Sequence, residues 1–274
     1  MKSPRSHPDA NGHLESVSQS LRTVTEELDV ATRALQQQPP ESDAVVSAAL
    51  ARRVWTYGSA MCDLMYRRMP PGDSDSFEHL APLGANARCM GDAFIQFYYF
   101  SAEPDDRDER EFRHLLFRRH ELQNYLNLIE VDSSFLGAAP PGAVARLRKA
   151  LAAAHAEIVK HPVFTLRDDR TRSLICNPDR KHGYFRSVFE ESEDILQRAS
   201  MPLAAHTWRH MLGSQVIHST PFSLSWEASM KDDRDGKIGR WVESFLDWAI
   251  DLQQCTVDHL NRMFPNELSQ RGNR

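Results

Sequence analysis

The sequence predicts an all-α protein: a multi-helix bundle with one heptad-patterned helix near its start and one long irregular loop. Three observations support this. Apolar residues recur at helical spacing in several long segments, no segment alternates like a strand, and proline-rich breaks separate the segments. The composition, 41% apolar and 26% charged, is that of a globular chain, and 274 residues are enough to bury a sizeable core.

The first element is a helix over residues 13–38, after a tail at 1–12 that we expect to be flexible because it is rich in Pro, Ser, Asn and Gly. Pro39 and Pro40 end the helix, since proline has no N–H to donate. Its apolar residues are three and four apart in alternation: Leu14, Val17, Leu21, Val24, Leu28, Ala31 and Leu35. Such a narrow stripe packs on its own domain or on a second copy, so residues 14–35 are a candidate homo-oligomer contact.

Residues 42–264 are assigned to one helical bundle domain. Ser42 is a good N-cap for its first helix, which the Pro70-Pro71-Gly72 sequence ends. A further helix from about Leu83 to Ala102 is apolar on most sides of its C-terminal half, which predicts a central, buried position.

Later segments of the domain also follow helical spacing, interrupted by one region that does not. Periodicity fades from Val163 to Tyr184, which predicts the long irregular loop. We expect residues 265–274 to form a second flexible tail. The remaining helices are expected at about 112–132, 143–161, 185–198 and 237–263.

Charge and cysteine usage restrict the class of protein. A formal net charge of −5 gives no overall basic field for nucleic acid or anionic lipid. Four scattered cysteines fit reduced thiols better than a disulfide scaffold. With no signal-like N-terminus, no long apolar run and no Gly-rich phosphate loop, we expect a cytoplasmic protein with no membrane contact and no cofactor.

The segment from His206 to Trp226 mixes polar side chains with core-type residues, and buried polar groups need partners. Ser214 and His218 are four residues apart there, and a neutral histidine is suited to act as a base. Arg88 and Asp92 are also four apart, on the helix expected to be central. We therefore expect Arg88, Asp92, Ser214 and His218 to form an interior polar site for a ligand or for catalysis.

A metal site is a second alternative. His206 and His210 have the spacing with which two imidazoles on one helical face share a metal ion. No zincin or di-iron motif supplies the further ligands, so a helical metalloenzyme is the weaker hypothesis.

The region from Lys160 to Arg186 is locally basic. It carries seven positive residues against three negative ones, interleaved with Phe164, Tyr184 and Phe185, a mixture suited to phosphates and stacked bases. The alternative is a solvated loop that pairs with the acidic residues after it. The candidate contacts for RNA or a nucleotide are Arg170, Arg172, Arg180, Lys181 and Arg186.

The string GSQVIHSTPFSL resembles the S-x-x-x-H-x-x-P element of a family of uncharacterised, mostly bacterial all-helical proteins known as a domain of unknown function. That family carries R-x-x-x-E on an earlier helix, where this chain has Arg88-x-x-x-Asp92 with the shorter acid. The resemblance spans roughly Ala44 to Met263.

More distantly, the architecture is similar to the HEPN class of helical bundles, several of which cleave RNA with an R-x(4 to 6)-H motif. Here eight residues separate Arg209 from His218, so the resemblance implies RNA chemistry only with another arginine such as Arg88. The main hypothesis is therefore an interior ligand or RNA-related site of HEPN-like type. The alternative is a non-catalytic interaction protein that oligomerises through residues 14–35.

Overall fold

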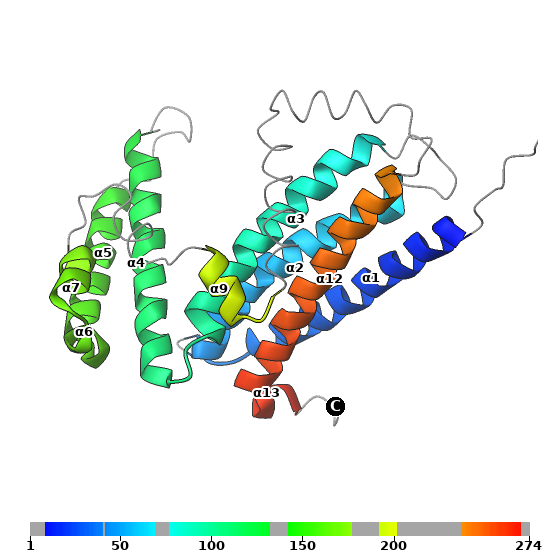
Figure 1. Cartoon of the computed structure of the whole chain (residues 1–274). Helices are drawn as coiled ribbons and strands as arrows, with labels where there is room; N and C mark the ends of the chain where they lie inside the picture. Colours follow the sequence, from blue (N-terminus) through cyan, green and yellow to red (C-terminus); the bar gives the residue numbers. More distant parts are fainter. Residues whose placement is uncertain are drawn as a thin grey trace, which may run out of the picture. The chain divides into compact units, whose positions relative to one another are not determined.

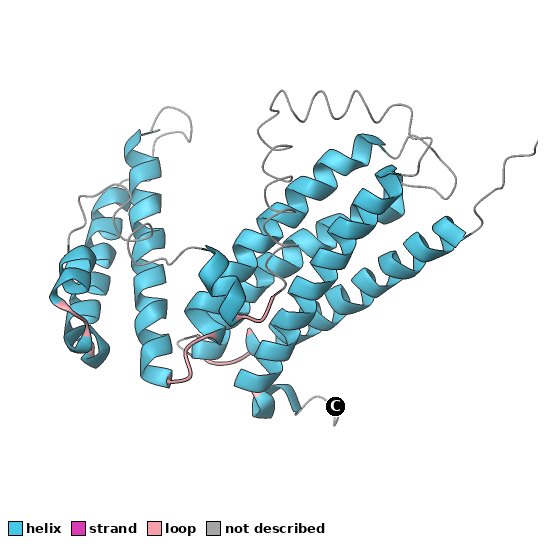
Figure 2. Ribbon diagram, in the orientation of Figure 1, coloured by secondary structure: helices cyan, strands magenta, loops and turns pink. Residues whose placement is uncertain are grey.

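The structure is a computed structural model of the chain and describes residues 9–40, 42–68, 77–131, 142–176, 192–201 and 237–269. These residues are helices joined by short turns and contain no strand (Figure 2), which confirms the predicted all-α fold. They fall into two compact units that divide between Tyr98 and Tyr99 and again between Ile195 and Leu196. This division differs from the single bundle domain expected over residues 42–264.

Unit 1 is built around long helices from both ends of the chain (Figure 1). Helix α2 packs on α1 and α3, and α12 packs on all three. The helices of unit 1 are α1 (Asp9–Leu35), α2 (Asp43–Arg68), α3 (Phe77–Phe97), α12 (Lys237–Met263) and α13 (Pro265–Ser269).

The heptad stripe of α1 packs inside unit 1. Helix α1 contacts α2 and α12, and six of the seven stripe residues are buried. Burying a leucine or valine side chain stabilises a fold by roughly 1.5–3 kcal/mol, so this stripe contributes to the core of the unit. The buried members are Val17, Leu21, Val24, Leu28, Ala31 and Leu35.

Helix α3 is central, as its composition predicts. Phe94 and Phe97 on α3 and Phe245 and Trp248 on α12 are all less than 2% exposed. A Cβ atom added at Gly84 would lie 3.2 Å from the ring of Phe245, so the absence of a side chain there lets α12 approach closely. Helix α12 is thus a close neighbour of α3 at Gly84, whereas Ser214 and His218 lie outside the described residues.

Unit 2 has a smaller core made by short and long helices together. Its helices are α4 (Arg107–Val131), α5 (Ala143–Lys160), α6 (Pro162–Leu166) and α7 (Asp169–Cys176). Their core residues are Phe112, Leu116, Ile158, Val163, Phe164 and Ile175. A short helix, α9 (Ser192–Arg198), spans the division between the units.

Helices α6 and α7 correct the expected irregular loop, because residues 162–176 are largely helical. The imidazole of His161 accepts a hydrogen bond from the backbone N–H of Val163 and caps α6. The Asp168 carboxylate accepts hydrogen bonds from the N–H and hydroxyl of Thr171 and caps α7. Residues 177–191 lie outside the described part.

At both ends of the described part, helices enter the stretches that the sequence predicts to be flexible tails. Helix α1 begins at Asp9, inside the stretch 1–12, and α13 occupies residues 265–269 of the second tail. Ser269 donates its hydroxyl to the carbonyl of Pro265, which is the first residue of α13 and the position where proline's missing N–H costs least.

Candidate functional site

The predicted pair of Arg88 and Asp92 forms on α3, with 3.7 Å between Nη2 and Oδ2. Its side chains are 23% and 45% exposed, so the expectation that this pair lies in the interior is wrong. The spacing of four residues brings the two groups together on one face, but that face borders solvent. Ser214 and His218, the other members of the expected cluster, are outside the described residues.

Two neighbouring groups share the α2–α3 face with this pair. The Tyr57 hydroxyl and the Cys89 thiol are hydrogen-bonded, and burial raises the pKa of both groups. The Asp92 carboxylate raises the pKa of Cys89 further. Both groups therefore stay protonated at neutral pH, which makes the thiol a poor nucleophile.

The other predicted sites are described only in part. In the basic region, Arg172 pairs with Asp169 and Arg170 is exposed, while Arg180, Lys181 and Arg186 lie outside the described residues. The histidines His206 and His210 lie outside as well. Within the described ranges, no group of three or more His, Cys, Asp or Glu side chains is placed to hold a metal ion.

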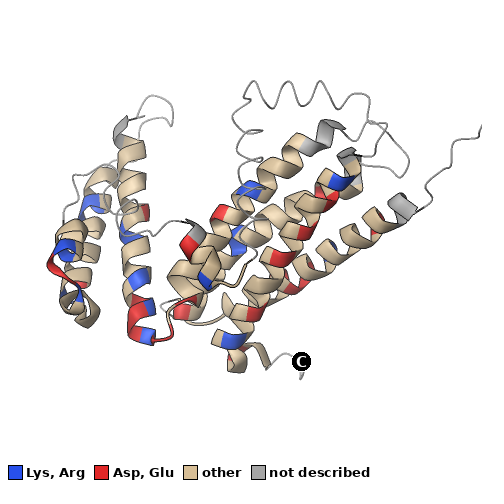
Figure 3. Cartoon of the chain, in the orientation of Figure 1, with Lys and Arg blue, Asp and Glu red and all other residues tan. Residues whose placement is uncertain are grey.

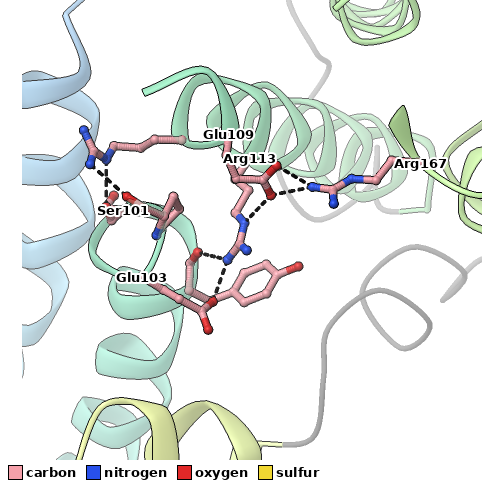
Figure 4. A network of polar contacts seen from close by, with 8 residues as sticks. Ser101, Glu103, Glu109, Arg113 and Arg167 are labelled. Carbon is pink, nitrogen blue, oxygen red and sulfur yellow. Dashed lines mark hydrogen bonds and ion pairs between the residues drawn. The ribbon is translucent and has the colours of Figure 1, made fainter. Parts of the chain in front are cut away.

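Unit 2 contains a polar network centred on Arg113 of α4 (Figure 4). Arg113 donates to Glu103 at 2.6 Å, to Glu109 at 2.8 Å and to the carbonyl of Tyr99 at 2.7 Å. Arg167 donates to both oxygens of the Glu109 carboxylate. Burial lowers the pKa of Arg113, but its hydrogen bonds with Glu109 and Glu103 outweigh that effect, so the pKa is raised.

The network fastens α4 to η1 (Tyr98–Ala102), a π-helical turn at the end of α3. Arg110 donates to the carbonyls of Ser101 and Pro104, both at 2.9 Å. The Ser101 hydroxyl and the His114 Nε2 atom are 3.0 Å apart and buried. Because these arginines satisfy carbonyls where the regular helix ends, the network is structural in kind.

Unit 1 has a groove between α1 and α2 with a volume of about 450 Å³. We call it the α1–α2 groove. Its volume falls within the range of ligand and peptide-side-chain pockets. Its lining residues are Arg22, Thr25, Glu26, Asp29, Val30, Trp55, Ser59, Cys62, Asp63 and Tyr66.

The α1–α2 groove combines exposed apolar surface with negative charge. Val30 is 51% exposed and Tyr66 is 46% exposed, so both present apolar atoms to solvent. The lining carries three carboxylates and one arginine, and Arg52, which stacks on the lining residue Trp55, pairs with one of these carboxylates, Asp29. At its floor, the Thr25 hydroxyl and the Cys62 sulfur are 3.7 Å apart, and burial raises the pKa of the thiol.

An arginine stacks on an aromatic ring at each end of the groove. The guanidinium carbon of Arg22 lies 3.5 Å from the centre of the Tyr66 ring, and that of Arg52 lies 3.4 Å from the Trp55 ring. The Tyr66 hydroxyl donates to the Gln19 side chain at 3.1 Å, which holds the ring in place. Cations are attracted to such ring faces, so the groove has the chemistry of a cation-binding surface.

Sequence reasoning did not find this groove. The heptad pattern of α1 indicates only the apolar stripe, whereas the groove residues of α1 lie on the flank of that stripe. A signal was present in the repeated spacing of Arg22, Glu26, Asp29 and Val30, which places a basic, an acidic and an apolar group on one face.

No helix in the described ranges is both long enough and apolar enough to span a membrane. No protein family, curated protein or solved structure matches this chain. The class that fold and site define is an all-helical protein with an acidic, aromatic groove on one unit.

Proposed function

We propose that the protein is a non-catalytic interaction module whose α1–α2 groove binds a basic, amphipathic helical segment of a partner protein. The observation that carries the proposal is the groove itself, which places exposed Val30 and Tyr66 beside three carboxylates. A groove between two helices accepts the apolar face of a third, and rim carboxylates pair with basic residues on that third helix.

The α1–α2 groove accounts better for interaction than for an interior catalytic site. Arg88 and Asp92 pair with each other at the surface, and the thiols of Cys62 and Cys89 have raised pKa values. The negative lining also disfavours nucleic-acid phosphates in this groove. The HEPN-like, RNA-related hypothesis therefore has no support from the groove.

Residues 14–35 contact the partner, in this proposal, through a face other than the apolar stripe. The apolar stripe of this helix is buried within unit 1, so it does not supply the contact surface. The adjoining face, with Arg22, Glu26 and Val30, supplies it instead. The same helix serves the core on one side and the partner on the other.

The test is a titration of the full chain with a fluorescently labelled amphipathic helical peptide whose polar face carries arginines. Binding is followed by fluorescence anisotropy, and a peptide with glutamates in place of the arginines is the charge-inverted comparison. We expect the basic peptide to bind, the acidic peptide not to bind, and the affinity to fall as salt is raised. Equal binding of both peptides, or of neither, overturns the proposal.

A matched pair of variants locates the contact. Glu26→Gln removes a groove carboxylate and should weaken the basic peptide by about 2- to 5-fold, the range for an exposed ion pair. Glu27→Gln makes the same change at the next residue of α1, which does not line the groove, and should leave the affinity unchanged. Equal effects of the two variants would place the peptide elsewhere.

A further inference from the structure

The two ends of the α1–α2 groove hold their arginines with different strength. Arg52 stacks on Trp55, forms an ion pair with Asp29 and donates to the hydroxyl of Thr32. Its side chain is thus fixed by three kinds of contact. Arg22 has the stacking contact with Tyr66 and, within the described ranges, no ion pair with a carboxylate.

Carboxylates nevertheless lie near Arg22. Glu26 follows it by one helical turn on α1, and Asp63 precedes Tyr66 by nearly one turn on α2. Arg22, Glu26 and Asp63 line the groove together with Cys62 and Tyr66. A guanidinium entering from solvent would meet the Tyr66 ring with these carboxylates beside it.

From this asymmetry we infer that the Tyr66 end is an arginine-recognition position, and that Arg22 occupies it as an internal competitor in the free protein. A partner's guanidinium displaces Arg22 from the Tyr66 ring and takes the same stacked position. Displacement costs little, because a cation–π contact at an exposed site is weak. This inference rests on the proposed function, since it concerns the same groove.

The same geometry explains why arginine is favoured over lysine at this position. A guanidinium is planar and stacks on a ring while its N–H groups point outward to carboxylates. Tyr66 is held by its hydrogen bond to Gln19, so the ring is already oriented for stacking. A lysine ammonium gains the charge interaction but not the planar contact.

The experiment compares the wild-type chain with Arg22→Ala by anisotropy titration, using three peptides that differ at one residue: arginine, lysine or citrulline. Citrulline has the shape of arginine without its charge. We expect Arg22→Ala to bind the arginine peptide about 2- to 5-fold more tightly than the wild type, corresponding to one exposed cation–π contact. The gain should be smaller for lysine and absent for citrulline.

Three other results of this titration would contradict the inference, and one of them would contradict the proposed function as well. If the wild type binds the arginine peptide but Arg22→Ala binds it equally or less tightly, the competitor inference fails while the proposed function stands. An equal gain with citrulline also overturns the inference, because it shows that only bulk was removed. If neither protein binds any peptide, both proposals fail.

A second variant separates displacement from misfolding. Arg22→Ala/Tyr66→Leu lacks the ring, so it should lose the gain that Arg22→Ala shows with the arginine peptide. Its far-ultraviolet circular dichroism should match that of Arg22→Ala, because both residues are on the surface side of their helices. If the double variant still binds the arginine peptide more tightly than the wild type does, the Tyr66 ring is not the arginine-recognition position.

Discussion

At the scale of single residues, Gln253 of α12 is a buried polar side chain in the described core. It is fully buried, and neither its amide oxygen nor its amide nitrogen has a hydrogen-bond partner. The amide lies against Gly58 of α2, where an added Cβ would be 2.5 Å from Oε1 and 2.6 Å from Nε2. Gly58 is therefore needed to make room for Gln253 in a close-packed interior.

Replacing Gly58 with alanine tests this contact. Alanine is the better helix former by about 1 kcal/mol, but here its methyl group should destabilise unit 1 by roughly 1–3 kcal/mol through overpacking. In a Gln253→Ala background the space is free, so the same change should become favourable. Unfolding in urea can be followed by tryptophan emission, which reports on unit 1 because residues 99–195 contain no tryptophan.

Gly239→Ala is the control for that experiment, because an added Cβ at this helical glycine meets no atom within 4 Å. It should be stabilising by several tenths of a kcal/mol, up to about 1 kcal/mol. If Gly58→Ala stabilises the unit as Gly239→Ala does, the close packing of Gly58 on Gln253 is not a constraint.

At the scale of elements, the start of α4 depends on side chains rather than on backbone continuity. Basic and acidic residues alternate there, and Figure 3 shows both colours at this end of the helix. Arg110 and Arg113 donate to the carbonyls of Tyr99, Ser101 and Pro104, which the end of a regular helix would leave without a partner. The junction of η1 with α4 is thus fixed by arginines.

Arg113→Met should destabilise unit 2 by about 2–4 kcal/mol, because it leaves the half-buried Glu103 and Glu109 carboxylates without this cation. The measurement is chemical unfolding followed by far-ultraviolet circular dichroism. Arg107→Met on the same helix breaks an exposed pair with Glu111 and should cost less than about 1 kcal/mol. Equal losses in the two variants would contradict the structural role of Arg113.

At the scale of the whole molecule, three histidines make stability depend on pH in one direction. Burial lowers the pKa of His120 to about 4, and it lowers those of His155 and His259 as well. The unfolded chain, with a histidine pKa near 6.5, therefore binds these protons more readily than the folded protein does. Their contribution is complete above about pH 6.5 and is lost as the pH falls toward about 4.

The urea midpoint should accordingly fall between about pH 7 and about pH 4.5, and His120→Gln should make this fall shallower. His13→Gln, which removes an exposed histidine of α1, is the control for the loss of one imidazole. Circular dichroism follows both units in this experiment. A pH dependence that is the same in all three proteins would show that the histidine at position 120 is not responsible.

The long helices could be predicted from the sequence because their buried apolar residues recur at regular helical intervals. The α1 stripe from Val17 to Leu35 is an example, and so is the all-round apolar end of α3. The helices α6 and α7 were missed because they are held by local caps at His161 and Asp168, which span too few residues to give a period. The interior position of Arg88 and Asp92 was also wrong, since a central helix can still have one face toward solvent.

The groove could not be predicted because it depends on which faces of α1 and α2 remain uncovered. Tyr66 is a large, mainly apolar residue of the kind found in cores, yet it is 46% exposed. Its partner Arg22 is 44 positions away in the sequence, and no local pattern joins them.

Unit 1 is interrupted in the sequence by unit 2, and this sets an order of events during synthesis. Lys237, the first residue of α12, follows the last residue of α3 by about 140 residues. At about 5–20 residues per second, a ribosome delivers α12 roughly 7 to 28 s after α3. During that interval the surfaces of α1, α2 and α3 that α12 covers have no such cover, so the nascent chain is most exposed to aggregation and to chaperones before its last long helix arrives.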